Sequence, residues 1–200
     1  MRVSRIQAAE NRQTVIDVAS RLFRECGFDG IGLKDLMKGA GLTQGAFYKQ
    51  FASKEDLAAQ SSARALESAF SRWSAAVTAN PKDPLGAVMA FYLSMEHRDA
   101  RMEGCPIVAL GSDAARQGAG VKASFEAGIR EYLELVGRWV GEADGEEPSG
   151  KAMAILSTMA GALLLSRAVN DEDLSKRFLQ AAAESVMGSS AGAAQQGQLQ

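Results

Sequence analysis

The residues best suited to chemistry lie in a short stretch between Thr43 and Phe51. Gly45 and Ala46 are small and stand where a short helix is expected to begin, so the backbone there could approach another molecule closely. The first amides of a helix carry partial positive charge, which suits a phosphate group. The major groove of DNA admits such a helix and exposes base edges to it. This stretch is therefore a candidate DNA-reading segment.

The apolar spacing around this segment predicts which side chains face outward. Phe47 and Phe51 lie four residues apart and are expected to face a core, so Tyr48 and Lys49 should point to solvent. Two alternatives remain open. Tyr48 and Lys49 could form an ordinary solvated face, and small helix-turn-helix units occur that do not bind DNA.

A longer helix is expected to position this segment. Apolar residues recur at helical spacing before Gly27, which should end the helix. They are Val15, Ile16, Ala19, Leu22 and Phe23. A short helix over residues 33–38 follows, then a small-residue turn over 39–41. Two short helices joined by a glycine turn and packed on a longer helix are typical of a helix-turn-helix.

Side-chain caps are expected at two helix starts. The Thr43 side chain should accept a hydrogen bond from the amide of Ala46. Ser53 should begin the next helix, with Asp56 at the capping-box position.

The run from Gly39 to Leu57, GAGLTQGAFYKQFASKEDL, resembles the signature of the TetR family of bacterial repressors, and the similarity extends over about residues 10–57. The resemblance implies an all-helical fold, operator DNA as partner and a set of DNA-binding residues. Those placed at phosphates are Thr43, Tyr48, Lys49 and Lys54, and those placed at bases are Gln44 and Ala46, with Gly45 between them. One departure is that Ile31 and Gly32 stand where the family usually has Thr or Ser, which predicts a weaker cap and one phosphate contact fewer.

The remaining sequence predicts further helices and three parts of the chain. Helices are expected over residues 53–78, 85–97, 106–116, about 125–140, 151–169 and 172–186. We therefore expect an all-α fold with a DNA-binding domain at 1–52 and a helical ligand-binding and dimerisation domain at 53–188. The low-complexity segment 189–200 should be disordered.

The last two helices contain many small residues among Leu, Ile and Met, which permit close packing. Such a pair has a side left to bury, and a two-fold symmetric four-helix bundle would bury it, as the TetR resemblance also implies. The expected homodimer interface comprises Ile155, Met159, Leu163, Leu174 and Phe178. Alternatively, these helices complete the core of a monomer.

Aromatic and sulfur-containing side chains of the larger domain could line an apolar pocket for a small-molecule inducer. The candidates are Trp73, Phe91, Tyr92, Met95, Cys105, Phe125 and Tyr132. The alternative for each of them is plain core packing.

Cys105 lies between Gly104 and Pro106, and Pro106 suits the first position of a helix. The helix dipole would favour the thiolate there, and Arg98 and Arg101 could add positive charge. The segment 104–110 also resembles a Gly-Cys-x-x-x-x-Leu segment in a TetR branch that includes electrophile-responsive repressors of reductase genes. A buried cysteine that only packs is the alternative.

Composition excludes several classes of protein. The 200 residues carry a net charge of −2, but residues 1–57 hold nine Lys or Arg against seven Asp or Glu, which weakly favours DNA contact by this part. Two cysteines and one histidine predict no metal centre and no cofactor. No signal peptide or membrane span is evident, so we expect a cytoplasmic location.

An enzyme is not expected, because no nucleophile–base motif and no phosphate-binding glycine loop is recognisable, and His97 is expected at a solvated helix end. The sequence thus predicts a DNA-binding transcriptional regulator, a repressor released from a palindromic operator by a small-molecule or electrophile inducer. A helical interaction protein that has lost DNA binding is the rival class.

Overall fold

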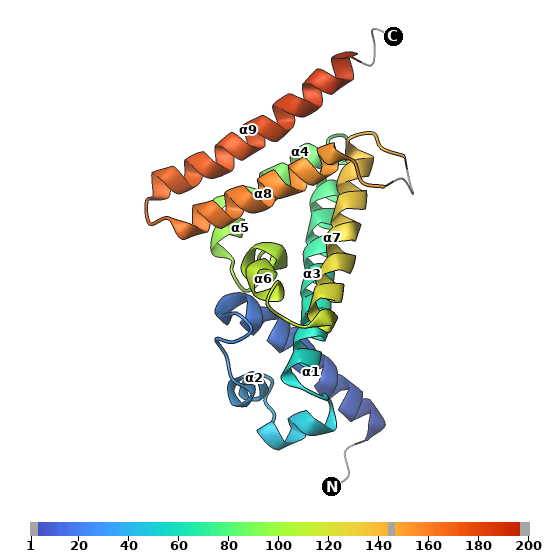
Figure 1. Ribbon diagram of the computed structural model, residues 1–200, viewed down its shortest axis with the longest axis vertical. Helices are drawn as coiled ribbons and strands as arrows, with labels where there is room; N and C mark the ends of the chain where they lie inside the picture. Colours follow the sequence, from blue (N-terminus) through green and yellow to red (C-terminus); the bar gives the residue numbers. More distant parts are fainter. Residues whose placement is uncertain (1–3, 144–146, 197–200) are drawn as a thin grey trace. The chain divides into compact units, whose positions relative to one another are not determined.

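A computed structural model of the chain describes residues 4–143 and 147–196 (Figure 1). All regular structure in this part of the chain is helical, which confirms the predicted all-α class. The described chain forms two compact units. The first comprises the chain up to Ala69 together with Arg101–Gly128, and the second comprises Phe70–Ala100 together with the chain from Ile129 onward. The predicted division at residues 52–53 concerns expected roles and stays a prediction.

Helix α1 (Arg5–Cys26) opens the first unit and is fixed at both ends. The Ser4 hydroxyl accepts a hydrogen bond from the amide of Gln7 at 3.1 Å. At the other end, Gly27 has a φ of +78°, and its amide donates to the carbonyl of Phe23. The predicted glycine stop of this helix is therefore confirmed.

Helix α2 (Leu33–Gly39) and the 3₁₀-helix η1 (Gln44–Lys49) follow as the two short elements of the helix-turn-helix. Helix α2 begins after Gly32 without a side-chain cap, as the departure from the family pattern predicts. The cap predicted for the Thr43 side chain is wrong, because the amide of Ala46 donates to the backbone carbonyl of Thr43 at 3.0 Å. The Thr43 carbonyl accepts this hydrogen bond because each hydrogen bond of a 3₁₀-helix joins residues three positions apart.

Helix α3 (Lys54–Ala79) begins with the expected reciprocal cap. The amide of Asp56 donates to Ser53 Oγ at 3.0 Å, and the Asp56 carboxylate accepts from the amide of Ala52 at 3.0 Å. The carboxylate thus reaches one residue further back than in the usual capping box, which joins the end of η1's loop to the start of α3.

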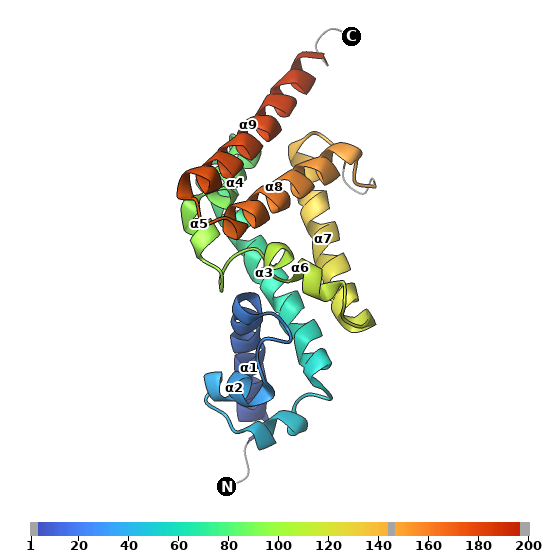
Figure 2. The ribbon, with the colours of Figure 1, turned by 60° about the vertical axis from the view of Figure 1, so that its left-hand side comes forward.

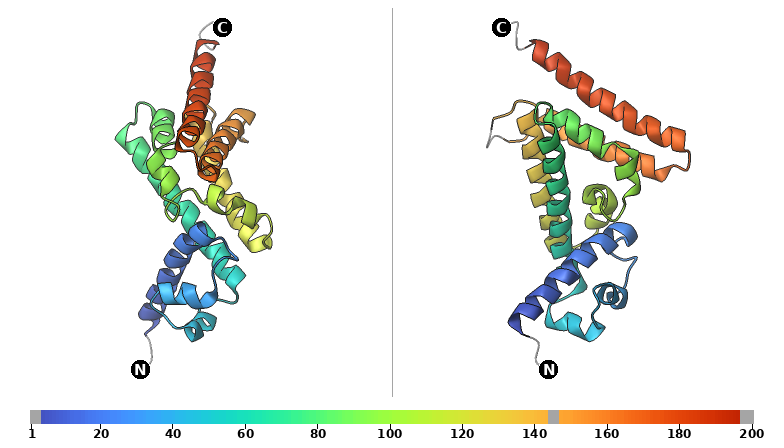
Figure 3. Two further views of the ribbon diagram at one scale, coloured as in Figure 1. Left: turned by 90° about the vertical axis from the view of Figure 1, so that its left-hand side faces the viewer. Right: turned by 180° about the vertical axis from the view of Figure 1, so that it is seen from behind.

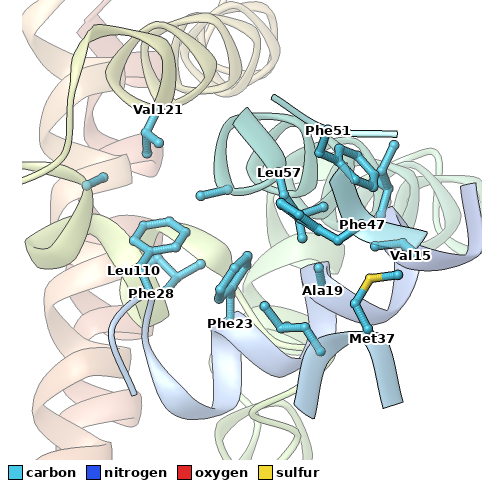
Figure 4. Packing of buried hydrophobic residues seen from close by; sticks show 14 of the residues in the cluster. Val15, Ala19, Phe23, Phe28, Met37, Phe47, Phe51, Leu57, Leu110 and Val121 are labelled. Atoms are coloured by element: carbon cyan, nitrogen blue, oxygen red, sulfur yellow. The ribbon is translucent and has the colours of Figure 1, made fainter. Parts of the chain in front are cut away.

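The core of the first unit gathers side chains from all of these helices (Figure 4). Phe47 and Phe51 stack with ring centroids 5.4 Å apart, and both are buried. Leu110 from α6 (Pro106–Ala114) and Val121 from α7 (Ala119–Trp139) join the same core. The helix-turn-helix therefore shares its interior with two later helices, an arrangement that the linear domain prediction does not include.

The second unit contains helices α4 (Pro84–Tyr92) and α5 (Met95–Asp99), where a single helix over 85–97 was expected. That expectation is wrong, because the Ser94 hydroxyl accepts from the amide of His97 at 3.0 Å and starts a new helix. Serine competes with backbone groups for hydrogen bonds in this way, and so favours helix starts over helix interiors.

Helices α8 (Gly150–Ala168) and α9 (Glu172–Gln196) complete the second unit. Helix α9 turns back along α8, and its C-terminal part diverges from it (Figures 2 and 3). It continues to Gln196, although composition predicts disorder over 189–200; residues 197–200 lie outside the described part.

We predict that Gly27→Ala lowers the free energy of unfolding by about 1–3 kcal/mol, because the φ and ψ of this residue lie in a region that only glycine adopts readily. A Cβ atom there would also lie 2.8 Å from the Asp113 carboxylate. Urea denaturation measures the effect. Gly150→Ala is the matched control, because a Cβ at Gly150 meets nothing within 4 Å. Equal stability of the two variants would contradict this account.

Candidate DNA-binding site

The predicted reading segment presents its polar residues to solvent. Thr43, Gln44, Gly45 and Lys49 are exposed. Tyr48 is 68% exposed, although aromatic side chains are usually more buried than this. The predicted outward orientation of Tyr48 and Lys49 is confirmed.

Aromatic packing on its buried side fixes the reading segment. Phe47 is fully buried, and its ring lies edge-on to Tyr48 with centroids 5.2 Å apart. The Arg12 guanidinium lies over the ring of Phe51 at 5.0 Å and also donates to Gln60 at 2.5 Å. These contacts connect α1, the end of the reading segment at Phe51, and α3. The exposed side chains are therefore held on a rigid part of the fold.

Three predicted contact residues, Gly45, Ala46 and Lys54, differ in their surroundings. A Cβ at Gly45 would meet nothing within 4 Å, so no neighbour inside the protein requires glycine there. The open space is available to a partner molecule. Lys54 begins α3 and is half-buried, with Ala46 likewise half-buried on η1.

A buried arginine joins the end of α1, within the helix-turn-helix domain that we call the reading head (α1, α2 and η1), to the segment before α6. The Arg24 side chain is 1% exposed, and it donates to the carbonyls of Ser20 at 2.9 Å and Gly104 at 3.0 Å. Glu103 lies 3.9 Å from the same guanidinium. At the other end of α6, the Asp113 carboxylate accepts from the amide of Phe28 at 3.2 Å. Sequence reasoning missed both residues, because their partners lie about eighty positions away.

The predicted pocket residues divide between the two units. Trp73, Tyr92 and Tyr132 are buried together in the second unit, with the Trp73 ring 5.6 Å from Tyr92 and 4.5 Å from Tyr132. Phe91 and Met95 are half-buried in the same unit. A groove of about 450 Å³ runs between α4 and α9, and Met95 contributes to its wall.

Phe125 and Cys105 belong to the first unit. Phe125 packs in the core shared with the helix-turn-helix, so the structure gives it a packing role. Cys105 is 5% exposed and stands at the N-cap position of α6 without a capping hydrogen bond from its side chain, and Pro106 occupies the first helical position as predicted. Arg98, expected to add charge near the thiol, instead donates to the carbonyl of Ser166 and pairs with Asp99.

The expectation that His97 is solvated is wrong. His97 is 5% exposed, its Nδ1 lies 2.7 Å from the carbonyl oxygen of Tyr92, and its ring packs 5.1 Å from that of Phe91. Burial lowers the pKa of His97 to about 4, and the charges of Arg167 and Arg72 act in the same direction. The imidazole is therefore neutral at pH 7.

The residues expected at a dimer interface lie in two environments. Ile155, Met159 and Leu163 are buried within the chain itself, so they serve its own core. Leu174 and Phe178 are half-buried on α9. The exposed large apolar residues of α8 are Met153, Leu164 and Leu165.

The described residues contain no group of three or more His, Cys, Asp or Glu side chains able to hold a metal ion. Within the same part of the chain, every helix is too short or too polar to cross a lipid bilayer.

A comparison with known families finds a match on the helix-turn-helix. Residues 15–60 match the model of the bacterial regulatory proteins of the tetR family. The helix-turn-helix of this chain is therefore that of the tetR family of bacterial regulators. TetR-family regulators are not enzymes. The matched residues 15–60 include the reading segment described above.

Curated relatives are similar over part of their length. The HTH-type transcriptional repressor KstR2 of Mycobacterium tuberculosis is 32% identical over 99 residues, which are 48% of this chain and 50% of KstR2. The regulator AcrR of Shigella flexneri is 43% identical over 56 residues, 28% of this chain and 26% of AcrR. The chain thus matches about half the length of the first of these relatives and a quarter of the second.

Solved structures share the fold over nearly the whole chain. NemR of Escherichia coli in its reduced form has a TM-score of 0.74 at 22% identity, covering 90% of this chain and 97% of NemR. A TetR regulator of Chloroflexus aurantiacus also has a TM-score of 0.74, at 25% identity, covering 90% of this chain and 96% of that one. The all-helical TetR fold therefore extends through both units.

We predict that the free energy of unfolding falls by up to about 3 kcal/mol between pH 6.5 and pH 4 through His97 alone. Its pKa in the folded chain is about 4, below the ordinary 6.5, so the unfolded chain takes up the proton first as pH falls. The contribution is complete above pH 6.5 and lost toward pH 4. Urea denaturation at several pH values should show a shallower pH dependence for His97→Gln. Parallel profiles for the two proteins would refute this assignment.

Proposed function

We propose that this TetR-family chain is a transcriptional repressor that binds a palindromic operator as a homodimer and releases it when a small molecule binds the second unit. The observation that carries the proposal is the braced reading segment. Tyr48 and Lys49 project into solvent from η1, while Phe47 beneath them is fully buried. A gel shift with the DNA flanking the chain's own gene tests it, and a folded protein that shifts no such DNA would favour the rival interaction protein.

The contacts with DNA follow from side-chain chemistry. Lys49 supplies a charge and Tyr48 a hydroxyl at the exposed end of η1, and both suit phosphate oxygens. Thr43 and Lys54 flank the segment and take the same role. Gln44 can donate and accept at once, which suits a base edge, and Gly45 and Ala46 leave room for that approach.

Exposed apolar residues on α8 support the homodimer. Leu164 and Leu165 are 53% and 46% exposed, and Met153 is also exposed on this helix. A second copy of α8 and α9 would cover them in a four-helix bundle. Two reading heads related by two-fold symmetry then match two half-sites of a palindrome.

The Arg24 contacts support coupling between effector and DNA. Because Arg24 binds the carbonyl of Gly104 and Asp113 binds the amide of Phe28, a shift of α6 would move the end of α1. An effector releases DNA only if it binds the non-reading arrangement more tightly. The burial of Cys105 favours an effector that binds without a covalent bond to that thiol.

We predict that Lys49→Ala weakens binding to operator and to unrelated DNA by similar factors and lowers the salt slope by about 1, because a phosphate contact carries no sequence information. Gln44→Ala should instead reduce discrimination between operator and mismatched sites by about 1–3 kcal/mol. Fluorescence anisotropy at several salt concentrations measures both. Lys82→Ala, at an exposed lysine outside the reading head, is the control. Unchanged affinity and slope for Lys49→Ala would remove this lysine from the interface.

We predict that Leu165→Glu raises the dimer dissociation constant at least roughly ten-fold, since burying an unpaired carboxylate in an apolar interface costs several kcal/mol. Sedimentation velocity measures the change. Ala123→Glu, at an exposed alanine of α7, should leave the dimer intact. A Leu165→Glu protein that is as dimeric as this control would place the interface elsewhere.

A further inference from the structure

Arg72 is a half-buried arginine of α3 that differs from Arg24 and Arg167 in its hydrogen bonding. Its Nε and Nη2 atoms are buried, and neither has a hydrogen-bond partner among the residues that the structure describes. Arg24 donates to two carbonyls, and Arg167 donates to the carbonyls of Arg98 at 2.8 Å and His97 at 3.0 Å. Buried cationic groups are normally paired in this way, because an unpaired one costs free energy. The two buried nitrogen atoms of Arg72 depart from this pattern.

The surroundings of Arg72 are cationic. Arg72 and Arg167 are the two charged groups that act on His97, and both lower its pKa. Burial lowers the pKa of His97 most and the two charges add to that effect, so the imidazole is neutral at pH 7 and adds no positive charge. The two guanidinium groups that act on this ring carry positive charge, which favours an anionic ligand over a neutral one near them.

The same region is rich in aromatic surface. Trp73 follows Arg72 on α3, and its ring lies edge-on to Tyr92 at 5.6 Å. Tyr92 in turn lies 4.8 Å from His97. A guanidinium suits a carboxylate, because its fork of donors binds both carboxylate oxygens, and the aromatic side chains of the same unit suit an apolar or aromatic body.

We propose that Arg72 is the anion-binding residue of the second unit and that its ligand is the carboxylate of a small organic acid. The statement that this acid is the effector rests on the proposed function, whereas its binding to Arg72 does not. Sequence reasoning did not single out Arg72. The sequence feature that could have identified it is its spacing. Arg72 lies three residues after Ala69 and seven after Ala65, which are both buried, so helical spacing places a cation on the apolar face of α3.

The test measures binding of defined probes by isothermal titration calorimetry, without DNA. Benzoate, 3-phenylpropionate and octanoate are compared with their uncharged primary amides. At least one acid should bind about ten-fold or more tightly than its amide, as expected for charge-assisted hydrogen bonds. Arg72→Met should abolish this preference, and Arg72→Lys should retain part of it. Arg177→Met, at an exposed arginine of α9, should behave as the wild type.

A second measurement separates binding from structure. Without ligand, Arg72→Met should melt at the same temperature as the wild type or higher, because it removes an unpaired buried charge. If no acid binds better than its amide, or if Arg72→Met keeps the preference, the inference is wrong. Operator binding is measured on the same preparations. A protein that binds DNA but no acid overturns only this inference, and one that binds acids through Arg72 but no DNA overturns only the proposed function.

Discussion

The arrangement of the reading head depends on the burial of one aromatic side chain. Phe47 is fully buried, stacked on Phe51 and edge-on to Tyr48. Burying a phenylalanine contributes about 1.5–3 kcal/mol, and here it also fixes the orientation of a short 3₁₀-helix that would be marginal alone. Because Phe47 faces inward, the helical repeat places Tyr48 and Lys49 outside. The outward orientation of the proposed DNA-contact residues is thus a consequence of core packing.

A second constraint ties this head to the helices that follow. Arg24 is buried at the end of α1 with its guanidinium on backbone carbonyls, and the Asp113 carboxylate holds the backbone just after Gly27. Both contacts use groups that would be costly to leave unpaired. The helix-turn-helix and α6 should therefore move as one body within the first unit, as the proposed control by an effector requires.

The sequence predicted the reading head well because its signals are local. Three features that predicted it each involve residues no more than four positions apart. They are the helix stop at Gly27, the cap formed by Ser53 and Asp56, and the spacing of Phe47 and Phe51. Signals of longer range were not available. Helix α8 is apolar around much of its circumference, so its periodicity could not tell that Met159 packs inside the chain and Leu165 outside. The burial of His97 depends on the break at Ser94 and on Arg167 about seventy residues later.

The central claim is that the exposed face of η1 reads a symmetric operator. DNase I footprinting of the full-length chain on the DNA flanking its own gene tests it most directly, with protection followed over a salt titration. The account predicts two protected half-sites related by two-fold symmetry, lost together as salt rises because phosphate contacts supply much of the affinity. Protection of a single asymmetric site, or no protection by a folded dimer at low salt, would contradict it.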